Sequence, residues 1–215
     1  SDSISNESGY LFKLRLTTIK AFIGITFFSY IICEILSLFN LFSFNYVLIS
    51  WILINGLIIF LDKEKIKLNM FSIFSQEIII PKKEKNILFF IFFLIILPLL
   101  LLAIFIAPNN WDSMAYHLPR VEHWIQNKNI YPYPTNIVRQ LLTSPLSEYI
   151  IVNFQILAGT DAFSNLVQFA SFIFILFTGT LIFRLLKIGI NGQLFLILAL
   201  LSLPMILFQA TTTQT

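Results

Sequence analysis

The sequence predicts an all-α polytopic membrane protein. Of its 215 residues, 57% are hydrophobic and only 12% are charged, whereas about a quarter of the residues in a typical soluble domain are charged. Five segments of about 20 residues or more are dominated by Phe, Ile and Leu, and each is long enough to cross a bilayer as a helix. This composition excludes an ordinary soluble enzyme, a disordered regulator and a nucleic-acid-binding protein.

The predicted spans divide the chain, which we expect to form one transmembrane domain over residues 1–215. They are residues 17–39, 41–61, 87–107, 162–186 and 190–209. A lysine-rich loop, residues 62–86, separates the second span from the third, and a larger loop, residues 108–161, separates the third from the fourth. The chain has no initiator Met and stops in a polar stretch after an apolar run, so we expect a piece of a longer protein.

The distribution of cations predicts the orientation. Three of the fourteen Lys and Arg residues fall in the loop 108–161, and the other eleven fall on the opposite side of the predicted spans. The eleven are Lys13, Arg15, Lys20, Lys63, Lys65, Lys67, Lys82, Lys83, Lys85, Arg184 and Lys187. Because cytoplasmic loops are enriched in Lys and Arg, we expect the N-terminus and residues 62–86 in the cytoplasm and residues 108–161 outside.

The external loop begins with a predicted helix. Asn109 or Asn110 can cap its start, and Pro119 is expected to interrupt it because proline lacks the N–H that an interior position donates. Beyond the proline, apolar residues repeat at the spacing of one helix face, which predicts an interfacial helix. This apolar stripe consists of Val121, Trp124 and Ile125. Trp111 and Trp124 are expected to anchor the loop at the membrane surface.

A second short helix of the external loop is predicted over residues 146–158. This apolar segment rises only about 20 Å, which is too short to span a bilayer. Gly159 directly after it is typical of a helix end. We therefore expect the segment to lie in the outer interface, so that the external loop consists of short interfacial helices.

The residues that suggest chemistry lie at the start of the external loop. Asp112 and Tyr116 are four residues apart and are therefore neighbours on one helix face. A carboxylate held there beside an aromatic ring can act as a base on a hydroxyl or amine, bind a cation, or simply cap the helix. His117 and His123 fall on opposite sides of a regular helix, so their spacing does not suggest a metal site.

Several short motifs in residues 87–215, taken in order, resemble those of the GT-C membrane glycosyltransferases. The similarity is greatest to the bacterial branch that includes the lipid A aminoarabinose transferase and the protein O-mannosyltransferase-like enzymes. The motifs are WDSMAY at 111–116, IYPYPT at 130–135, SPLSEY at 144–149, AGTDAFSNL at 158–166 and SLPMILFQA at 202–210. The resemblance implies that residues 87–215 form a GT-C-like N-terminal half, to which residues 1–61 add two spans. Ser144 departs from it, because aminoarabinose relatives carry Lys there, and a second acidic residue of the family pattern would lie beyond Thr215.

In that family an Asp of the first external loop is the catalytic base, so the resemblance assigns this role to Asp112. The donor is a polyprenyl-phosphate sugar, and loop cations contact its phosphate, for which Arg120 and Arg139 are available. The full set of residues expected to bind substrate is Tyr116, His117, Arg120, Arg139 and Tyr149. No residue is assigned to a metal, and a divalent cation stays open as a cofactor.

The resemblance therefore implies sugar transfer to a lipid, glycan or protein acceptor at the outer face of the bacterial cytoplasmic membrane. Membrane lipids are expected partners, nucleic acid is not, and the piece is expected to be inactive alone. The alternatives are a transporter or flippase of lipid-linked glycans and a non-catalytic membrane subunit. A transporter would need polar residues at mid-membrane and broken helices, whereas the predicted spans are nearly free of ionisable residues.

Overall fold

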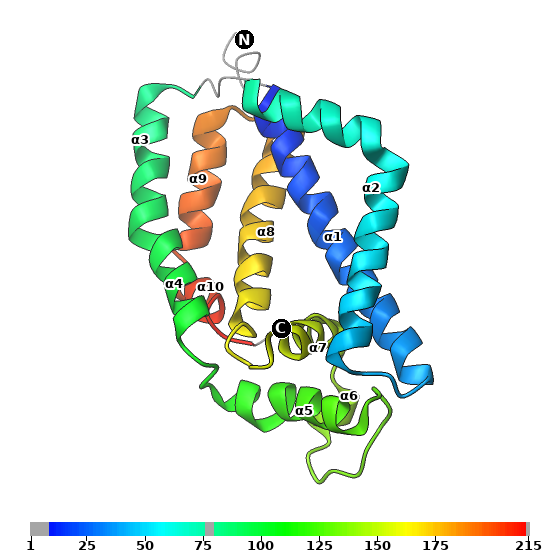
Figure 1. The fold of residues 1–215 in the computed structure, drawn as a ribbon. Coiled ribbons are helices and arrows are strands. Elements are labelled where there is room, and N and C mark those ends of the chain that lie inside the picture. Colours follow the sequence, from blue (N-terminus) through cyan, green and yellow to red (C-terminus); the bar gives the residue numbers. More distant parts are fainter. Residues whose placement is uncertain (1–8, 76–79, 214–215) are drawn as a thin grey trace.

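A computed structural model describes residues 9–75 and 80–213, and over these residues the chain folds into helices (Figure 1). The α-helices are α1 (Gly9–Leu38), α2 (Phe44–Ser75), α3 (Lys82–Ile91), α4 (Leu97–Phe105), α5 (Leu118–Asn127), α6 (Arg139–Leu142), α7 (Leu146–Ala158), α8 (Asn165–Leu185), α9 (Ile190–Leu201) and α10 (Pro204–Gln209). Two π-helical turns, η1 (Phe92–Ile96) and η2 (Ser113–His117), precede α4 and α5. The prediction of an all-α protein is confirmed.

Four helical segments of the described residues are long and apolar enough to cross a membrane. They are Leu11–Leu38, Phe44–Leu61, Lys82–Phe105 and Asn165–Leu185. Each corresponds to one of the first four predicted spans. The third runs from α3 through η1 into α4 without interruption, because the wider turn of η1 ends just before Pro98, which has no N–H to donate. The chain is thus an all-α membrane protein.

The fifth predicted span does not form one helix. α9 ends at Leu201, and α10 begins at Pro204. Leu203, the residue before this proline, is extended with φ −87° and ψ 106°, because proline disfavours the helical conformation in its predecessor. The prediction of a continuous helix over residues 190–209 is therefore wrong, and a broken pair of helices takes its place.

The lysine-rich loop is also shorter than predicted. α2 continues to Ser75, and α3 begins at Lys82, so most of residues 62–86 is helical. Part of the predicted loop, residues 76–79, lies outside the described residues. The helical extension of α2 is consistent with the absence of Gly and Pro from residues 57–80.

The spans leave the predicted cytoplasmic cations at one end of the molecule and the external loop at the other. In Figure 1 the starts of α1, α3 and α9 and the end of α8 lie at the top, and α5, α6 and α7 lie at the bottom. Two apolar cores hold this arrangement. One joins α1 and α2 to α5 and α7, and the other joins α3 and α4 to α8, α9 and α10. The first two spans thus pack against α5 and α7, two helices of the loop 108–161.

The helix predicted over residues 146–158 is confirmed as α7. It ends at Gly159, whose φ of 69° lies in the left-handed region that glycine adopts without strain. α7 packs against α1, α2 and α5, and Ile151 and Val152 are fully buried. Protein contacts therefore hold α7, and its placement in the membrane interface stays a prediction.

Candidate functional site

Residues 111–127 of the loop 108–161 form a single helix, which consists of Trp111–Asp112, η2 and α5. Its first turn is capped by Asn110, because the backbone N–H of Ser113 donates to Asn110 Oδ1 at 2.6 Å. The predicted cap at Asn109 or Asn110 is thus confirmed. Since Asn110 supplies the cap, the carboxylate of Asp112 is left for another role.

Pro119 does not stop this helix. It lies in the first turn of α5, directly after the π-helical turn Ser113–His117. A π-turn widens the backbone by one residue, so the carbonyl that would face the missing N–H of the proline is displaced. The predicted interruption therefore takes the form of a local widening, and the residues on both sides stay on one continuous element.

Asp112, Tyr116 and Arg139 meet on the outer side of this helix. The Arg139 Nη1 atom lies 3.7 Å from Asp112 Oδ1, and the side chains of Arg139 and Asp112 are 69% and 26% exposed. The Arg139 guanidinium carbon lies 5.8 Å from the centre of the Tyr116 ring. A carboxylate, a guanidinium and a phenol are thus gathered at a surface that a ligand can reach.

The electrostatics of this cluster favour a protonated tyrosine. Partial burial is the largest cause that raises the pKa of Tyr116, and the negative charge of Asp112 raises it further, against a smaller lowering by Arg139. A hydrogen bond to Asp112 acts in the same direction as burial. Tyr116 therefore stays a hydrogen-bond donor at neutral pH, next to a carboxylate that can accept a proton.

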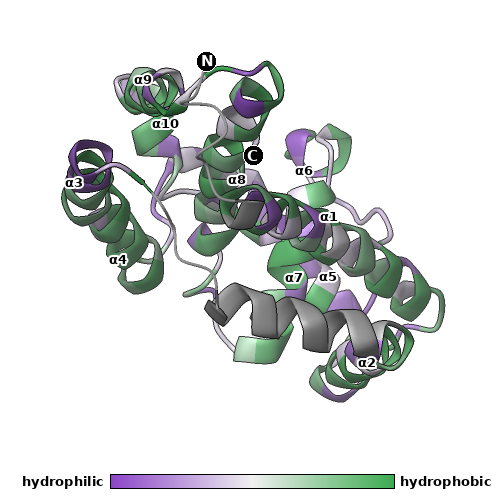
Figure 2. Ribbon diagram, turned by 90° about the horizontal axis from the view of Figure 1, so that it is seen from above, coloured by the Kyte–Doolittle hydropathy of each residue, from purple (hydrophilic) through white to green (hydrophobic). Residues whose placement is uncertain are grey.

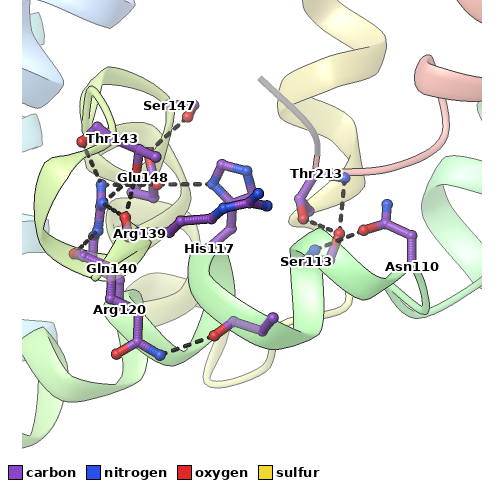
Figure 3. A network of polar contacts seen from close by, with 11 residues as sticks. Asn110, Ser113, His117, Arg120, Arg139, Gln140, Thr143, Ser147, Glu148 and Thr213 are labelled. Atoms are coloured by element: carbon purple, nitrogen blue, oxygen red, sulfur yellow. Dashed lines mark hydrogen bonds and ion pairs between the residues drawn. The ribbon is translucent and has the colours of Figure 1, made fainter. Parts of the chain in front are cut away.

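A buried network lies behind this cluster (Figure 3). Glu148 on α7 is fully buried and bonds His117 Nδ1 at 2.8 Å and Arg120 Nη1 at 3.1 Å through the same oxygen. Its second oxygen accepts a hydrogen bond from Ser147 Oγ at 2.8 Å. Burial by itself would raise the pKa of Glu148, but the hydrogen bond from His117 and the charge of Arg120 outweigh it and leave the pKa below its usual range.

Arg120 ties the segment 139–143 to the helix. Its guanidinium donates to the backbone carbonyls of Gln140 at 2.6 Å, Arg139 at 2.9 Å and Thr143 at 3.1 Å. It also donates to Thr143 Oγ1. Because one guanidinium carries five N–H donors in a fixed plane, this set of bonds fixes the backbone that carries the Arg139 side chain.

The C-terminal residues that the structure describes also return to this helix. The backbone N–H of Thr213 donates to Ser113 Oγ at 3.4 Å, and the two hydroxyl groups are hydrogen-bonded to each other. Both side chains are buried, and Figure 3 shows them near Asn110. The stretch after α10 therefore packs next to Asp112.

The predicted site residues divide into three groups. Asp112, Tyr116 and Arg139 form the exposed cluster, whereas His117 and Arg120 are buried behind it. Tyr149 belongs to neither of these two groups. Its ring stacks on Trp124 with centroids 5.5 Å apart, and its hydroxyl lies 3.4 Å from Glu34 Oε1.

The two tryptophans of the loop also differ in exposure. Trp111 is 82% exposed and suits a membrane anchor, but Trp124 is only 5% exposed. The predicted anchoring role of Trp124 is therefore wrong, because the apolar stripe of α5 faces α7 and the protein core. Burying a side chain of this size stabilises the folded loop by about 1.5–3 kcal/mol.

The two histidines have separate partners. His117 bonds Glu148, and His123 stacks on Tyr133 with ring centroids 4.0 Å apart. Within the part of the chain that the structure describes, no group of three His, Cys, Asp or Glu side chains is arranged to hold a metal ion.

Sequence reasoning missed Glu148 and Gln140. Gln140 Nε2 donates to the carbonyl of Ala115, and its Oε1 accepts from Tyr133 and Thr135. One signal was available for Glu148, since a carboxylate in the first turn of an otherwise apolar helix calls for a cationic partner. Comparisons with protein-family models, with curated proteins and with solved structures gave no significant match.

Proposed function

We propose that this chain is part of a membrane glycosyltransferase that uses a polyprenyl-phosphate sugar as donor and acts at the outer face of the membrane. The observation that carries the proposal is the exposed pair of Asp112 and Arg139, with Tyr116 beside it. A base and a cation 3.7 Å apart match the two charges that sugar transfer from a phosphate requires.

The proposed reaction uses each group once. The Asp112 carboxylate accepts the proton of an acceptor hydroxyl while the acceptor oxygen forms a bond to the anomeric carbon of the sugar. The bond between that carbon and the phosphate oxygen breaks, and the polyprenyl phosphate leaves with the electron pair. Arg139 pairs with the phosphate, and Tyr116 can donate a hydrogen bond to the same region. Arg120 is not given a phosphate contact, because it is 1% exposed and already bonds three carbonyls.

Apolar side chains around the cluster support a lipid-linked donor. Trp111 precedes Asp112, and Val138 and Leu142 flank Arg139, and these three side chains are 82%, 61% and 79% exposed. Exposed aromatic and aliphatic residues beside charged groups are typical of a surface that contacts the membrane interface. A prenyl chain could therefore stay in the bilayer while its phosphate reaches Arg139.

The test uses the full-length protein reconstituted in nanodiscs. Asp112→Asn is expected to lower transfer from a panel of radiolabelled polyprenyl-phosphate hexoses and pentoses by about 100-fold or more, since the base is lost. Binding of unsubstituted polyprenyl phosphate should stay within about 2-fold of the wild type. Arg139→Ala should weaken that binding by about 10-fold, because a charge-assisted contact is removed.

Glu34→Gln is the matched control, because it removes a carboxylate of the same end of the bundle that lies outside the exposed cluster. It is expected to keep wild-type transfer and binding. Wild-type turnover in Asp112→Asn, or a wild-type protein that neither binds polyprenyl phosphate nor transfers any sugar of the panel, would overturn the proposal.

A transporter or flippase of lipid-linked glycans is the second candidate, and one observation favours it. The chain between α9 and α10 is a broken helix. The same protein can be reconstituted in vesicles and tested for movement of a fluorescent lipid-linked glycan between the two leaflets. Movement that is unchanged by Asp112→Asn would support this candidate instead.

A further inference from the structure

An apolar cavity of about 400 Å³ lies at the end of the bundle opposite to the candidate site. It is lined by residues of α1, α3 with η1, α8 and α9, and Figure 2 shows these helices as largely hydrophobic apart from the start of α3. Its volume falls in the range of small-molecule sites in proteins. Most of the lining is aliphatic or aromatic, as at Leu14, Phe92, Leu176 and Leu194.

One cationic side chain lies in this apolar lining. Arg15 lines the cavity and is 8% exposed. Its Nη1 atom donates to Gln193 Oε1 at 2.8 Å and lies 3.5 Å from the carbonyl of Thr180. Gln193 is held in turn, because its Nε2 atom donates to the carbonyl of Ile188 at 3.2 Å. The guanidinium is thus fixed at the cavity, where an anion that reached it would be bound in surroundings of low dielectric.

The same end of the bundle is rich in exposed cations. Lys82, Lys83 and Lys85 lie at the start of α3, and Lys13 lies on α1 two residues before Arg15. Lysine and arginine side chains near a membrane surface attract anionic headgroups. The apolar cavity, with Arg15 in its lining and these lysines at the same end of the bundle, therefore matches the two parts of one molecule, an apolar chain and an anionic head.

We propose that this cavity binds an anionic phospholipid, with one acyl chain in the cavity and the phosphate at Arg15. An acyl chain gains little by moving from the bilayer into such a cavity, because both surroundings are apolar, so selectivity comes from the head. The site favours an anionic over a zwitterionic headgroup. The inference is independent of the proposed sugar transfer, because the two sites lie at opposite ends of the spans.

The test is lipid retention by the full-length protein. The protein is purified from vesicles of equal phosphatidylglycerol and phosphatidylcholine, and bound lipid is counted by native mass spectrometry. The wild type is expected to retain one phosphatidylglycerol in preference to phosphatidylcholine. Arg15→Gln should lower this preference by about 10-fold, since a charge-assisted hydrogen bond is lost.

Two further variants keep the result decisive if Arg15→Gln folds poorly. Leu194→Phe places a larger ring in the lining while leaving Arg15 in place, so it should narrow the cavity and lower lipid retention in the folded protein. Lys128→Gln, a cation at the other end of the bundle, should retain phosphatidylglycerol as the wild type does. Equal retention of the two lipids by the wild type, or unchanged retention in folded Leu194→Phe protein, would overturn the proposal.

Discussion

Two pairs of arginine and carboxylate, an inner buried pair and an outer exposed pair, each have one member on the helix over residues 111–127, and they differ in burial and in separation. In the inner pair, Arg120 and Glu148 are 3.1 Å apart, with side chains 2% and 0% exposed. In the outer pair, Arg139 and Asp112 are 3.7 Å apart and 69% and 26% exposed. The same two functional groups thus hold the loop together in the buried pair and are open to a ligand in the exposed pair.

Burial explains the division. Removing two charges from water is costly, and the inner pair is tolerated because His117, Ser147 and three backbone carbonyls complete its hydrogen bonds. The outer pair stays hydrated, so water and salt screen it and it adds little to stability. A phosphate or hydroxyl can compete for the outer pair at small cost, which makes it the better place for chemistry.

The largest expected effect comes from breaking the inner pair. Arg120→Met leaves Glu148 buried without its guanidinium and frees the segment 139–143, so it should lower the free energy of unfolding by about 3–5 kcal/mol. Equilibrium unfolding in detergent measures this loss. The double variant Arg120→Met with Glu148→Leu should recover part of it, because no buried charge is left. A loss in Arg120→Met no greater than that in Arg139→Met would contradict the distinction between the pairs.

A change of pH is expected to have an effect of intermediate size on stability. The pKa of folded Glu148 lies below its usual range, whereas an unfolded glutamate titrates at about 4.3. The stabilising contribution of Glu148 is therefore fully present above pH 4.3 and is lost as the pH falls through the folded pKa. Thermal unfolding between pH 6 and pH 3 should show a steeper loss of stability in the wild type than in Glu148→Gln. Parallel curves would mean that the buried charge does not contribute.

The smallest effect should follow from changes in the outer pair. Asp112→Asn and Arg139→Met are each expected to change the free energy of unfolding by about 1 kcal/mol or less, as exposed ion pairs do. The same unfolding assay applies, at low and at high salt. A destabilisation of either variant as large as that of Arg120→Met would show that the outer pair is structural too.

The sequence predicted those elements that are set by local chemistry. α7 has the predicted bounds, because an apolar run between Pro145 and Gly159 determines both ends. The cap at Asn110 follows from the preference of Asn for helix starts. Helix spacing located the apolar stripe with Val121, but the stripe packs against the protein and not in the membrane interface. Pro204 breaks the last predicted span and is visible in the sequence, but the length of the apolar run favoured the prediction of one continuous helix.

Contacts between distant segments could not be predicted in this way. Arg120 and Arg139 look alike in the sequence, and only the tertiary structure brings Glu148, 28 residues along the chain, to one of them. The π-helical turn before Pro119 has no sequence signature beyond the proline itself. The sequence predicted Asp112, Tyr116 and Arg139 as site residues. Their separation from His117, Arg120 and Tyr149 is visible only in the folded structure.

The break between α9 and α10 also bears on the lipid around the protein. α9 has 12 residues and rises about 18 Å, well below a hydrocarbon thickness of about 30 Å. At its end, Ser202 N–H donates to the carbonyl of Leu198, Leu203 N–H to that of Leu200, and Ser202 Oγ to that of Ala199. A backbone that satisfies its own polar groups in this way can turn within the hydrocarbon without drawing water inward. The bilayer beside it can therefore keep its normal thickness and its seal against ions.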